Sequence, residues 1–490
     1  MPSSSRSPWK CAVFLFLFAL ALTSAGNWIL PLVDRDEPRF AEASREMIER
    51  HDWIVPHFNG DYRFDKPPLI YWCQVACFQV LGQNEFAARL PSVVATAATT
   101  VLIFLFGRRL YGGHEGSWAA IMFATSLQTL IHGRLAVADM LMVVFVTAAT
   151  WASWELIAAR DQQPHRPSLG WWWILWVSLG LGFLAKGPVA FLPILGLIIF
   201  LRWNGSASPM TSASWAAGIL VCLGIIALWG IPALVQTQGA FAKVGLGRHV
   251  VGRSIQPLEG HGFGGVIGYV ATLPLYLVTV FLSFCPWVFL LPGIILAAWR
   301  RRLLGTREKW LLSMVAAIVV PFSLVATKLP HYILPAMPAL ALWSAASWFQ
   351  LGREESRLRS MARGMTVAAL LITVPGFMIL SAFFPTPRLA QAVEPWVRPQ
   401  TEIGSNEYDE PSLVWYFRKK TQGFHRSMPA PALKQFMAEP GPRLCVLPTK
   451  DVGQVFGTIP PTWHSNRVTG LNLVHGRKVD ITILIRDTDP

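Results

Sequence analysis

The stretch CAVFLFLFALALTSAGNWILPLVDRDEPRF, residues 11–40, joins a long apolar run to a dense group of charges. Residues 11–33 contain no charged side chain. Because a helix rises about 1.5 Å per residue, such a run can cross a hydrocarbon layer of about 30 Å, whereas the apolar core of a secretory signal is shorter. We therefore expect an uncleaved first membrane span that carries the DRDE segment, residues 34–37, to the outer membrane surface.

The composition of the whole chain is typical of a membrane protein. Of its 490 residues, 53% are hydrophobic and 14% are charged, whereas about a quarter are charged in soluble domains. Repeated apolar runs predict a polytopic α-helical membrane protein with about eleven or more transmembrane helices. The expected spans lie near residues 11–33, 88–107, 115–132, 136–158, 170–184, 188–202, 212–236, 269–297, 309–327, 331–350 and 363–384.

The positions of the basic residues predict which loops face the cytoplasm. Much of the net charge of +14 comes from Lys and Arg in short loops, such as Arg300–Arg302. Loops enriched in Lys and Arg stay on the cytoplasmic side. We therefore expect no nucleic-acid partner, a cytoplasmic N-terminus, and an outer location for residues 34–87, 237–268 and 385–490.

Residues 1–384 are predicted to form the transmembrane domain, with residues 34–87 as its first outer loop. Within this loop, residues 38–50 have the periodicity of an amphipathic helix that lies in the membrane interface. Its charged residues are expected on a solvated face: Glu42, Arg45, Glu46 and Glu49.

Residues 385–490 are more polar and predict a small α/β domain. RLCVLP at 443–448 and VDITILI at 479–485 have strand character, and SLVWYF at 412–417 indicates the start of a helix.

Three ionisable residues interrupt or border apolar runs: Asp139, Lys186 and Lys328. Charged groups at membrane depth cost several kcal/mol, on the order of 3 or more, unless they are paired or face a polar cavity, so they indicate function by default. Asp139 could instead cap a helix, and the lysines could snorkel to the interface. His331 is interpreted as a turn or interface residue. Asp139, Lys186 and Lys328 all map to the outer side.

The outer loops add carboxylates and cations on that same side, including Asp36 and Lys66. Clustered Lys and Arg at a membrane surface suit a phosphate or pyrophosphate group. An anionic, lipid-linked substrate entering from the bilayer fits this pattern. Asp36 could also be the N-cap of the helix that follows it.

Five motifs occur in a characteristic order: DEPRFAE at 36–42, DWIVPH at 52–57, FDKPPLIYW at 64–72, NEFAARLP at 84–91 and KLPHYILP at 328–335. Together they resemble the bacterial lipid A aminoarabinose transferase family, within the protein O-mannosyltransferase-like group of C-type membrane glycosyltransferases. The resemblance extends over roughly residues 10–350. It implies a bacterial inner-membrane enzyme that transfers a sugar from an undecaprenyl phosphate carrier at the periplasmic face.

The resemblance also implies roles for individual residues. Asp36 would be the catalytic acid or base, and Asp139 matches a second acidic position of the family. A further set of residues would bind the donor phosphate or the substrate: Arg39, Lys66, Lys186, Arg253, Lys328 and Tyr332.

A divalent metal ion is the one cofactor that the resemblance suggests, held by Asp65 and His249. Relatives usually have Glu where this chain has Asp65, which is one methylene shorter, and the spacing from His249 to Arg253 also differs slightly. We expect no nucleotide or redox cofactor.

Three functions are compatible with these features. In the first, the acceptor is lipid A or a related envelope glycolipid, and direct attack without an enzyme-bound sugar inverts the anomeric carbon. In the second, the acceptor is a protein Ser or Thr hydroxyl, which requires a base such as Asp36. The third is a transporter or flippase of lipid-linked sugars, which would be expected to place polar groups near the bilayer midplane in inverted repeats.

Overall fold

The computed structural model describes residues 7–160, 169–245, 247, 265–301, 304–472 and 476–486. It divides the chain into two compact units, and each is described here by itself. The first comprises residues 1–25, 64–70 and 90–370, and the second comprises residues 26–63, 71–89 and 371–490. These units do not follow the predicted division at residue 385, because all of residues 34–87 except 64–70 group with residues 371–490.

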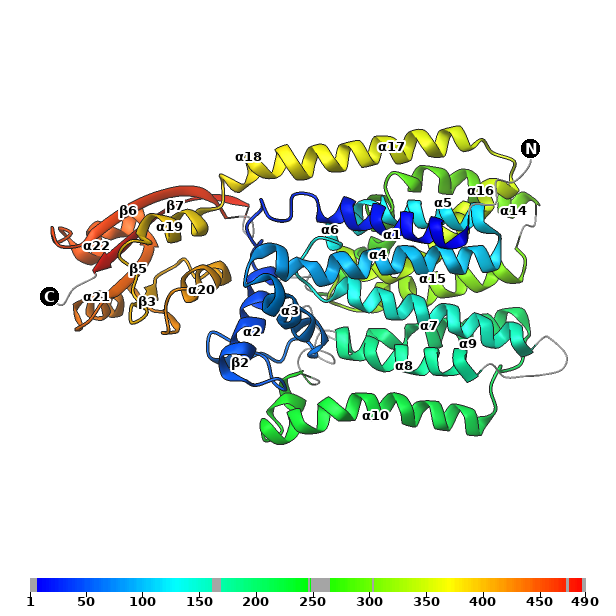
Figure 1. Ribbon diagram of the computed structural model, residues 1–490, viewed down its shortest axis with the longest axis horizontal. Helices are drawn as coiled ribbons and strands as arrows, with labels where there is room; N and C mark the ends of the chain where they lie inside the picture. The colour runs from blue at the N-terminus through cyan, green and yellow to red at the C-terminus, as the bar shows by residue number, and fades with distance from the viewer. Residues whose placement is uncertain are drawn as a thin grey trace. The chain divides into compact units, whose positions relative to one another are not determined.

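The first unit is helical, and its long helices run along one common direction (Figure 1). Its elements are α1 (Pro8–Ser24), most of α4 (Glu85–Leu110), α5 (Gly113–Ala124), α6 (Leu127–His132), α7 (Asp139–Arg160), α8 (Leu169–Lys186), η1 (Gly187–Phe191), α9 (Leu192–Asn204), α10 (Ser212–Gln236), α12 (Gly265–Ala271), α13 (Leu275–Ser283), η3 (Trp287–Leu290), α14 (Leu291–Arg301), α15 (Thr306–Leu324), η4 (Pro330–Ala336), α16 (Met337–Gln350) and α17 (Glu355–Leu371).

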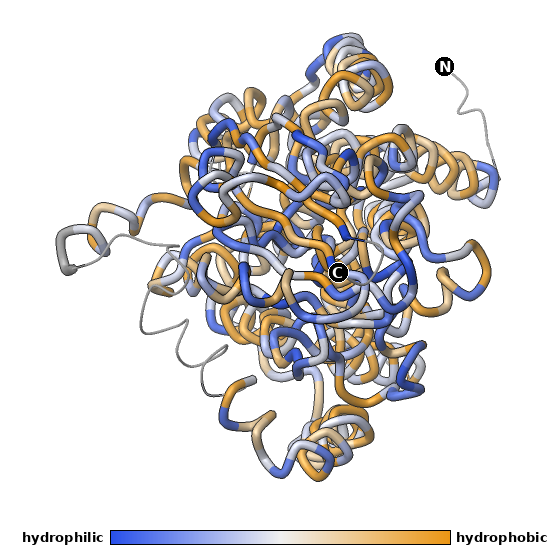
Figure 2. The backbone as a smooth tube through the Cα atoms, turned by 90° about the vertical axis from the view of Figure 1, so that its left-hand side faces the viewer, coloured by the Kyte–Doolittle hydropathy of each residue, from blue (hydrophilic) through white to orange (hydrophobic). Residues whose placement is uncertain are grey.

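These helices have the composition and exposure expected in a membrane. Among the described residues, six helical stretches are long and apolar enough to cross a bilayer. The number is seven if Gly268–Ser283 and Trp287–Arg300, two helical segments at an angle of 105° to each other, form one bent span. Figure 2 shows hydrophobic residues in orange along the helices. On α10, Leu228 and Val235 are 81% and 73% exposed, which is costly in water and favourable in lipid. The polytopic membrane fold is confirmed.

The described helices do not reproduce the count of eleven spans. The predicted span 115–132 is two short helices, α5 and α6, and the first helix ends at Ser24 although the apolar run continues to Val33. Hydropathy counts apolar residues whichever way the backbone bends, so it cannot distinguish one straight span from two short segments.

A reversal of the chain between α8 and α9 places Lys186 at a helix end. Gly187 has a φ of +77°, a conformation that suits glycine. The chain turns back so that the rings of Phe183 and Phe191 lie 5.8 Å apart. The break expected at AlaLysGlyPro is therefore a tight turn, with Lys186 as the last residue of α8.

The second unit combines helices with a five-stranded sheet. Its elements are α2 (Asp36–Arg50), β1 (His57–Phe58), β2 (Asp61–Tyr62), most of α3 (Leu69–Leu81), η5 (Ile372–Gly376), α18 (Phe377–Ser381), α19 (Pro385–Val393), β3 (Glu402–Ser405), α20 (Pro411–Arg418), β4 (His425–Ser427), α21 (Ala430–Ala438), β5 (Arg443–Pro448), η6 (Thr449–Asp451), α22 (Val452–Phe456), β6 (His464–Asn472) and β7 (Arg477–Arg486). The segments picked out from the sequence coincide with β5, β7 and α20.

The sheet has the order β4-β3-β5-β7-β6, with β4, β3 and β5 parallel and the last two pairings antiparallel. Helices cover both of its faces. Leu389 of α19 and Leu413 of α20 pack in one apolar core, and Leu433 of α21 packs in the other. The helix α20 also packs against α2.

Three of the four charged residues of α2 that were expected on a solvated face are buried, so the prediction is wrong for Glu42, Arg45 and Glu46, whereas the Glu49 side chain is 39% exposed. Glu42 and Glu46 are 0% exposed, and Arg45 is 1% exposed. Arg418 of α20 donates from Nη1 to Glu42 Oε1 at 3.1 Å and lies 3.3 Å from Glu46 Oε1. Its Nη2 donates to Glu49 Oε2 at 2.8 Å, and Arg45 pairs with Glu42. The sequence of α2 alone cannot reveal a partner that lies in a distant helix.

Candidate functional site

A buried ion pair joins the ends of two membrane helices in the first unit. Asp139 is the first residue of α7, and Lys186 is the last residue of α8. Lys186 Nζ donates to Asp139 Oδ1, and the two side chains are only 11% and 8% exposed. Each charge would be costly at this depth without the other. Two residues that the sequence marked separately are therefore brought together.

Aromatic and imidazole side chains of η4 complete the surroundings of this pair. His331 Nε2 lies 3.9 Å from Asp139 Oδ1. Lys186 Nζ lies 5.8 Å from the centre of the Tyr332 ring, within the range of a cation–π contact. The ring of Phe322 lies 5.0 Å from that of Tyr332 and limits its movement. Tyr332, predicted to act on the donor phosphate, is thus close to a predicted phosphate-binding lysine.

The sequence reasoning missed two histidines of this cluster. His132, at the end of α6, has its ring centroid 4.9 Å from that of His331. Its Nδ1 is 2.8 Å from Gln128 Nε2. His331 lies in the short 3₁₀ helix η4, and its Nε2 faces the buried carboxylate, a contact that its interpretation as a turn or interface residue does not include. A single histidine beside an apolar run gives little signal, but both lie within a few residues of marked positions, Asp139 and Lys328.

The remaining predicted residues of the first unit have other surroundings. Lys66 Nζ donates to the main-chain oxygen of Asp65 at 3.1 Å. Lys328 is buried, donates to the main-chain oxygen of Ser323, and has its Nζ 5.6 Å from the centre of the Tyr269 ring. His249 and Arg253 lie outside the described residues. The proposed pairing of Asp65 with His249 therefore stays a prediction.

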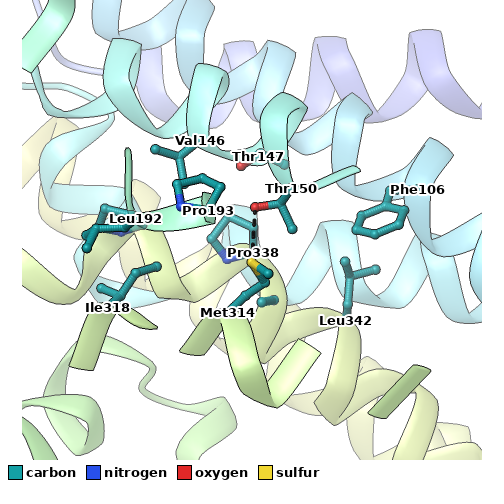
Figure 3. Close-up of a pocket in the computed structure, with 12 residues that line it drawn as sticks. Phe106, Val146, Thr147, Thr150, Leu192, Pro193, Met314, Ile318, Pro338 and Leu342 are labelled. Atoms are coloured by element: carbon teal, nitrogen blue, oxygen red, sulfur yellow. Dashed lines mark hydrogen bonds between the residues drawn. The ribbon is translucent and has the colours of Figure 1, made fainter. Parts of the chain in front are cut away.

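An apolar pocket also lies among these helices, lined by residues of α4, α7, α9, α15, η4 and α16 (Figure 3). Thr150 Oγ1 is 3.8 Å from Met314 Sδ, and Leu192 and Leu342 contribute to its apolar wall. The residues that line it include none of the predicted site residues. Apart from the hydroxyl groups of Thr147 and Thr150, its lining is apolar, and it includes no ionisable side chain.

In the second unit, Glu37 has a structural role at the start of α2. Its carboxylate accepts from Arg89 Nε at 2.8 Å and from Nη2 at 2.7 Å, and both side chains are 2% exposed. It also accepts from the main-chain N–H of Val33 at 2.8 Å. This bidentate pair fixes the first turn of the helix.

Asp36 is the exposed carboxylate of the same turn, and Arg39 follows it with partial exposure. The N-cap position of α2 is occupied by Arg35, so the alternative role of Asp36 as N-cap is wrong. A carboxylate in the first turn is favoured by the helix dipole. The Glu37–Arg89 pair therefore holds Asp36 on a rigid, solvent-accessible turn.

Asp34 caps a different helix. Its Oδ1 accepts from the main-chain N–H of Ser412 at 2.8 Å, and its Oδ2 accepts from the Ser412 hydroxyl at 2.6 Å, at the N-terminus of α20. Burial, the main cause, raises the pKa of Asp34 to about 7, and the nearby Glu410 contributes, while Arg39 acts in the opposite direction. The hydrogen bonds that join the DRDE segment to α20 are therefore made by Asp34, whose pKa is raised to about 7.

This raised pKa makes the stability of the second unit depend on pH. The folded protein favours the protonated carboxyl, so the stabilisation is fully present below the ordinary pKa of 3.8 and is lost as the pH rises through about 7. Between pH 5.5 and 8.5 the loss should be about 2 kcal/mol. Thermal unfolding of the detergent-purified protein should show it. Asp34→Asn should flatten the profile, whereas the exposed Asp61→Asn should not; equal profiles for wild type and Asp34→Asn would contradict the assignment.

Comparisons with known proteins agree with the resemblance found in the motifs. The family model described as dolichyl-phosphate-mannose-protein mannosyltransferase matches residues 65–231, a range that contains Asp139 and Lys186. An undecaprenyl phosphate-alpha-4-amino-4-deoxy-L-arabinose arabinosyl transferase of Edwardsiella ictaluri is 29% identical over 67% of this chain and 58% of its own length. A protein of the same name from Yersinia enterocolitica gives the same values. The similarity thus spans about 58% of the length of these relatives.

Solved structures show the same fold. ArnT from Cupriavidus metallidurans, crystallised with undecaprenyl phosphate, has a TM-score of 0.74 at 17% identity and covers 98% of both chains. The oligosaccharyltransferase of Archaeoglobus fulgidus in its apo form has a TM-score of 0.52 at 13% identity and covers 89% of this chain and 67% of its own. The chain therefore has the membrane C-type glycosyltransferase fold, and its resemblance to the ArnT-like family of aminoarabinose transferases is confirmed.

Proposed function

We propose that the protein is a glycosyltransferase of the bacterial inner membrane. It moves a sugar from a polyprenyl phosphate carrier, of the undecaprenyl type, to lipid A or a related envelope glycolipid. The observation that carries this proposal is the buried Lys186–Asp139 pair beside Tyr332, at the ends of two membrane helices. The names of the similar curated proteins support the choice of carrier and sugar class.

In this proposal, Lys186 binds the phosphate of the donor. Asp139 holds the ammonium in place within an apolar protein, where an unpaired cation would be costly. When the glycosidic bond to phosphate breaks, negative charge grows on the leaving oxygen, and a preorganised cation stabilises it. Further residues that we assign to the donor or to substrate binding are Arg39, Lys66, Arg253, Lys328 and Tyr332.

Asp36 is proposed as the general base for a hydroxyl acceptor. It is exposed, and the Glu37–Arg89 pair fixes its turn. A carboxylate accepts the hydroxyl proton as the acceptor attacks the anomeric carbon, with inversion. A phosphate acceptor is already anionic and needs no base. The effect of Asp36 on the rate thus depends on the acceptor.

The proposed topology has a cytoplasmic N-terminus, about eleven membrane crossings within residues 1–384, and periplasmic outer loops. Residues 385–490 form a periplasmic α/β domain in this scheme. A divalent metal ion bound by Asp65 and His249 is part of the same proposal and would support the donor phosphate.

A protein acceptor is the second candidate. The family model that matches residues 65–231 is described as a protein mannosyltransferase, and this favours Ser or Thr hydroxyls. The donor chemistry is the same in both cases. Only the acceptor and the need for Asp36 differ.

Mass spectrometry of lipid A and of envelope proteins tests the proposal. A Gram-negative host that makes a matching sugar carrier would express the wild type, Asp36→Asn or the exposed control Asp61→Asn. We expect a pentose-like or hexose-like adduct on lipid A with the wild type and the control. Its loss with Asp36→Asn would assign the residue to the chemistry, and an adduct on proteins would favour the second candidate. Absence of any adduct, with the wild type well expressed, would contradict transfer.

A further inference from the structure

His132, Asp139 and His331 form a compact cluster of potential metal ligands. They come from three elements, α6, α7 and η4. One ligand atom from each lies within 4.8 Å of the other two. His132 and Asp139 are 8% and 6% exposed, and His331 is partly buried.

The donor set suits a transition metal of the zinc class. Zinc binds His nitrogen and carboxylate oxygen at about 2.0–2.2 Å, so neighbouring ligand atoms in a tetrahedral site lie about 3.3 Å apart. His331 Nε2 and Asp139 Oδ1 are 3.9 Å apart. Small side-chain rotations are enough to close the remaining distance. Two histidines and one carboxylate also leave a fourth position open.

Gln128 and Ser283 support His132 as a ligand. The Gln128 amide lies 2.8 Å from His132 Nδ1, and Ser283 Oγ lies 3.3 Å from the other end of the amide. If the Gln128 side-chain oxygen faces His132, it accepts a hydrogen bond from Nδ1–H of the imidazole. The proton of the neutral ring is then on Nδ1, so Nε2 can bind a metal ion through its lone pair. The Ser283 hydroxyl can accept from the amide in that orientation, so no hydrogen bond is lost.

Lys186 competes with a metal ion for the same carboxylate. Its ammonium now donates to Asp139 Oδ1, and a divalent cation at this oxygen would repel it. The ammonium would then turn toward the nearby Tyr332 ring. Metal binding through Oδ1 and the Lys186–Asp139 hydrogen bond, which uses the same oxygen, are therefore mutually exclusive.

We propose that His132, Asp139 and His331 bind one zinc-class metal ion, which displaces Lys186 from Asp139 and makes its ammonium available to an anionic ligand. The residues of this site differ from the predicted pair Asp65 and His249. The metal binding itself does not depend on the proposed transferase activity.

Titration of the chelator-treated, detergent-purified full chain with Co²⁺ tests the site, because visible absorption reports tetrahedral coordination. The wild type should bind one equivalent with this signature, and zinc should abolish the signal. His132→Ala and His331→Ala should each weaken binding at least about tenfold, as loss of a ligand or its support does. His114→Ala, an exposed histidine near Glu355, is the matched control and should leave binding unchanged.

Lys186→Met separates this site from a general effect on folding. Removal of the competing ammonium should tighten Co²⁺ binding about tenfold or more, and misfolding cannot produce that gain. Weaker or unchanged binding in Lys186→Met would overturn the displacement. Failure of the wild type to bind Co²⁺, or binding that survives His132→Ala and His331→Ala, would overturn the site.

Discussion

Lys186→Ala should reduce sugar transfer about a hundred- to a thousandfold, the usual effect of removing one preorganised stabiliser of developing negative charge. Two consequences combine. The donor phosphate loses its cation, and Asp139, only 8% exposed, becomes an unpaired buried charge. The measurement is the initial rate of label transfer from a polyprenyl phosphate sugar in detergent. Lys434→Ala, which removes an exposed lysine of α21, is the matched control and should transfer at the wild-type rate.

A double variant distinguishes catalysis from structure in this pair. Lys186→Met together with Asp139→Asn removes both charges, so the cost of an unpaired carboxylate disappears. If Lys186 binds the donor phosphate, the double variant should fold with near wild-type thermal stability and remain as inactive as Lys186→Ala. Recovery of transfer in the double variant would show that the pair serves only the fold.

Arg418→Ala should destabilise the second unit by about 3–5 kcal/mol, as expected when one member of a buried ionic network is removed. Arg418 lies between Glu42 and Glu46, which are both 0% exposed, and without it the two carboxylates would face each other in a buried environment. Burial already raises the pKa of Glu42 and of Glu46, while Arg418 acts in the opposite direction on both. The expected result is a marked fall in the unfolding temperature and rapid proteolysis of this unit.

The matched control for this prediction is Arg426→Ala. Arg426 also pairs with a glutamate, Glu402, but its side chain is 59% exposed. Exposed pairs contribute about 1 kcal/mol or less. Equal unfolding temperatures for Arg418→Ala and Arg426→Ala would contradict the description of α2 as held through a buried network.

Much of the membrane fold follows from hydropathy, because a charged group at bilayer depth is costly and apolar runs are long. The same cost marks Asp139 and Lys186 individually, although they are 47 residues apart. Their pairing could not be predicted from the spacing, because it depends on the turn at Gly187. The proximity of His132 and His331 to Asp139 could not be predicted for a related reason, because it depends on how three elements pack.

The error on α2 has a specific cause. Its periodicity correctly predicts a helix with one charged face, but the same pattern fits water or a complementary surface. The complementary charge is on Arg418, 376 residues from Glu42. The sequence of the DRDE segment likewise does not reveal which carboxylates have partners in distant parts of the chain. Asp34 caps α20 and Glu37 pairs with Arg89, so of the three carboxylates the exposed Asp36 is the one that fits a catalytic role.

Sugar transfer in detergent, without any membrane gradient, shows whether the protein breaks one glycosidic bond and forms another. Purified wild type would be mixed with a radiolabelled polyprenyl phosphate sugar and lipid A, and the products would be separated by chromatography. We expect label to move to lipid A and sugar-free polyprenyl phosphate to appear in equal amount. If all the label stays on the carrier, while the same protein in vesicles moves the labelled lipid from one leaflet to the other, the protein is a transporter and not a glycosyltransferase.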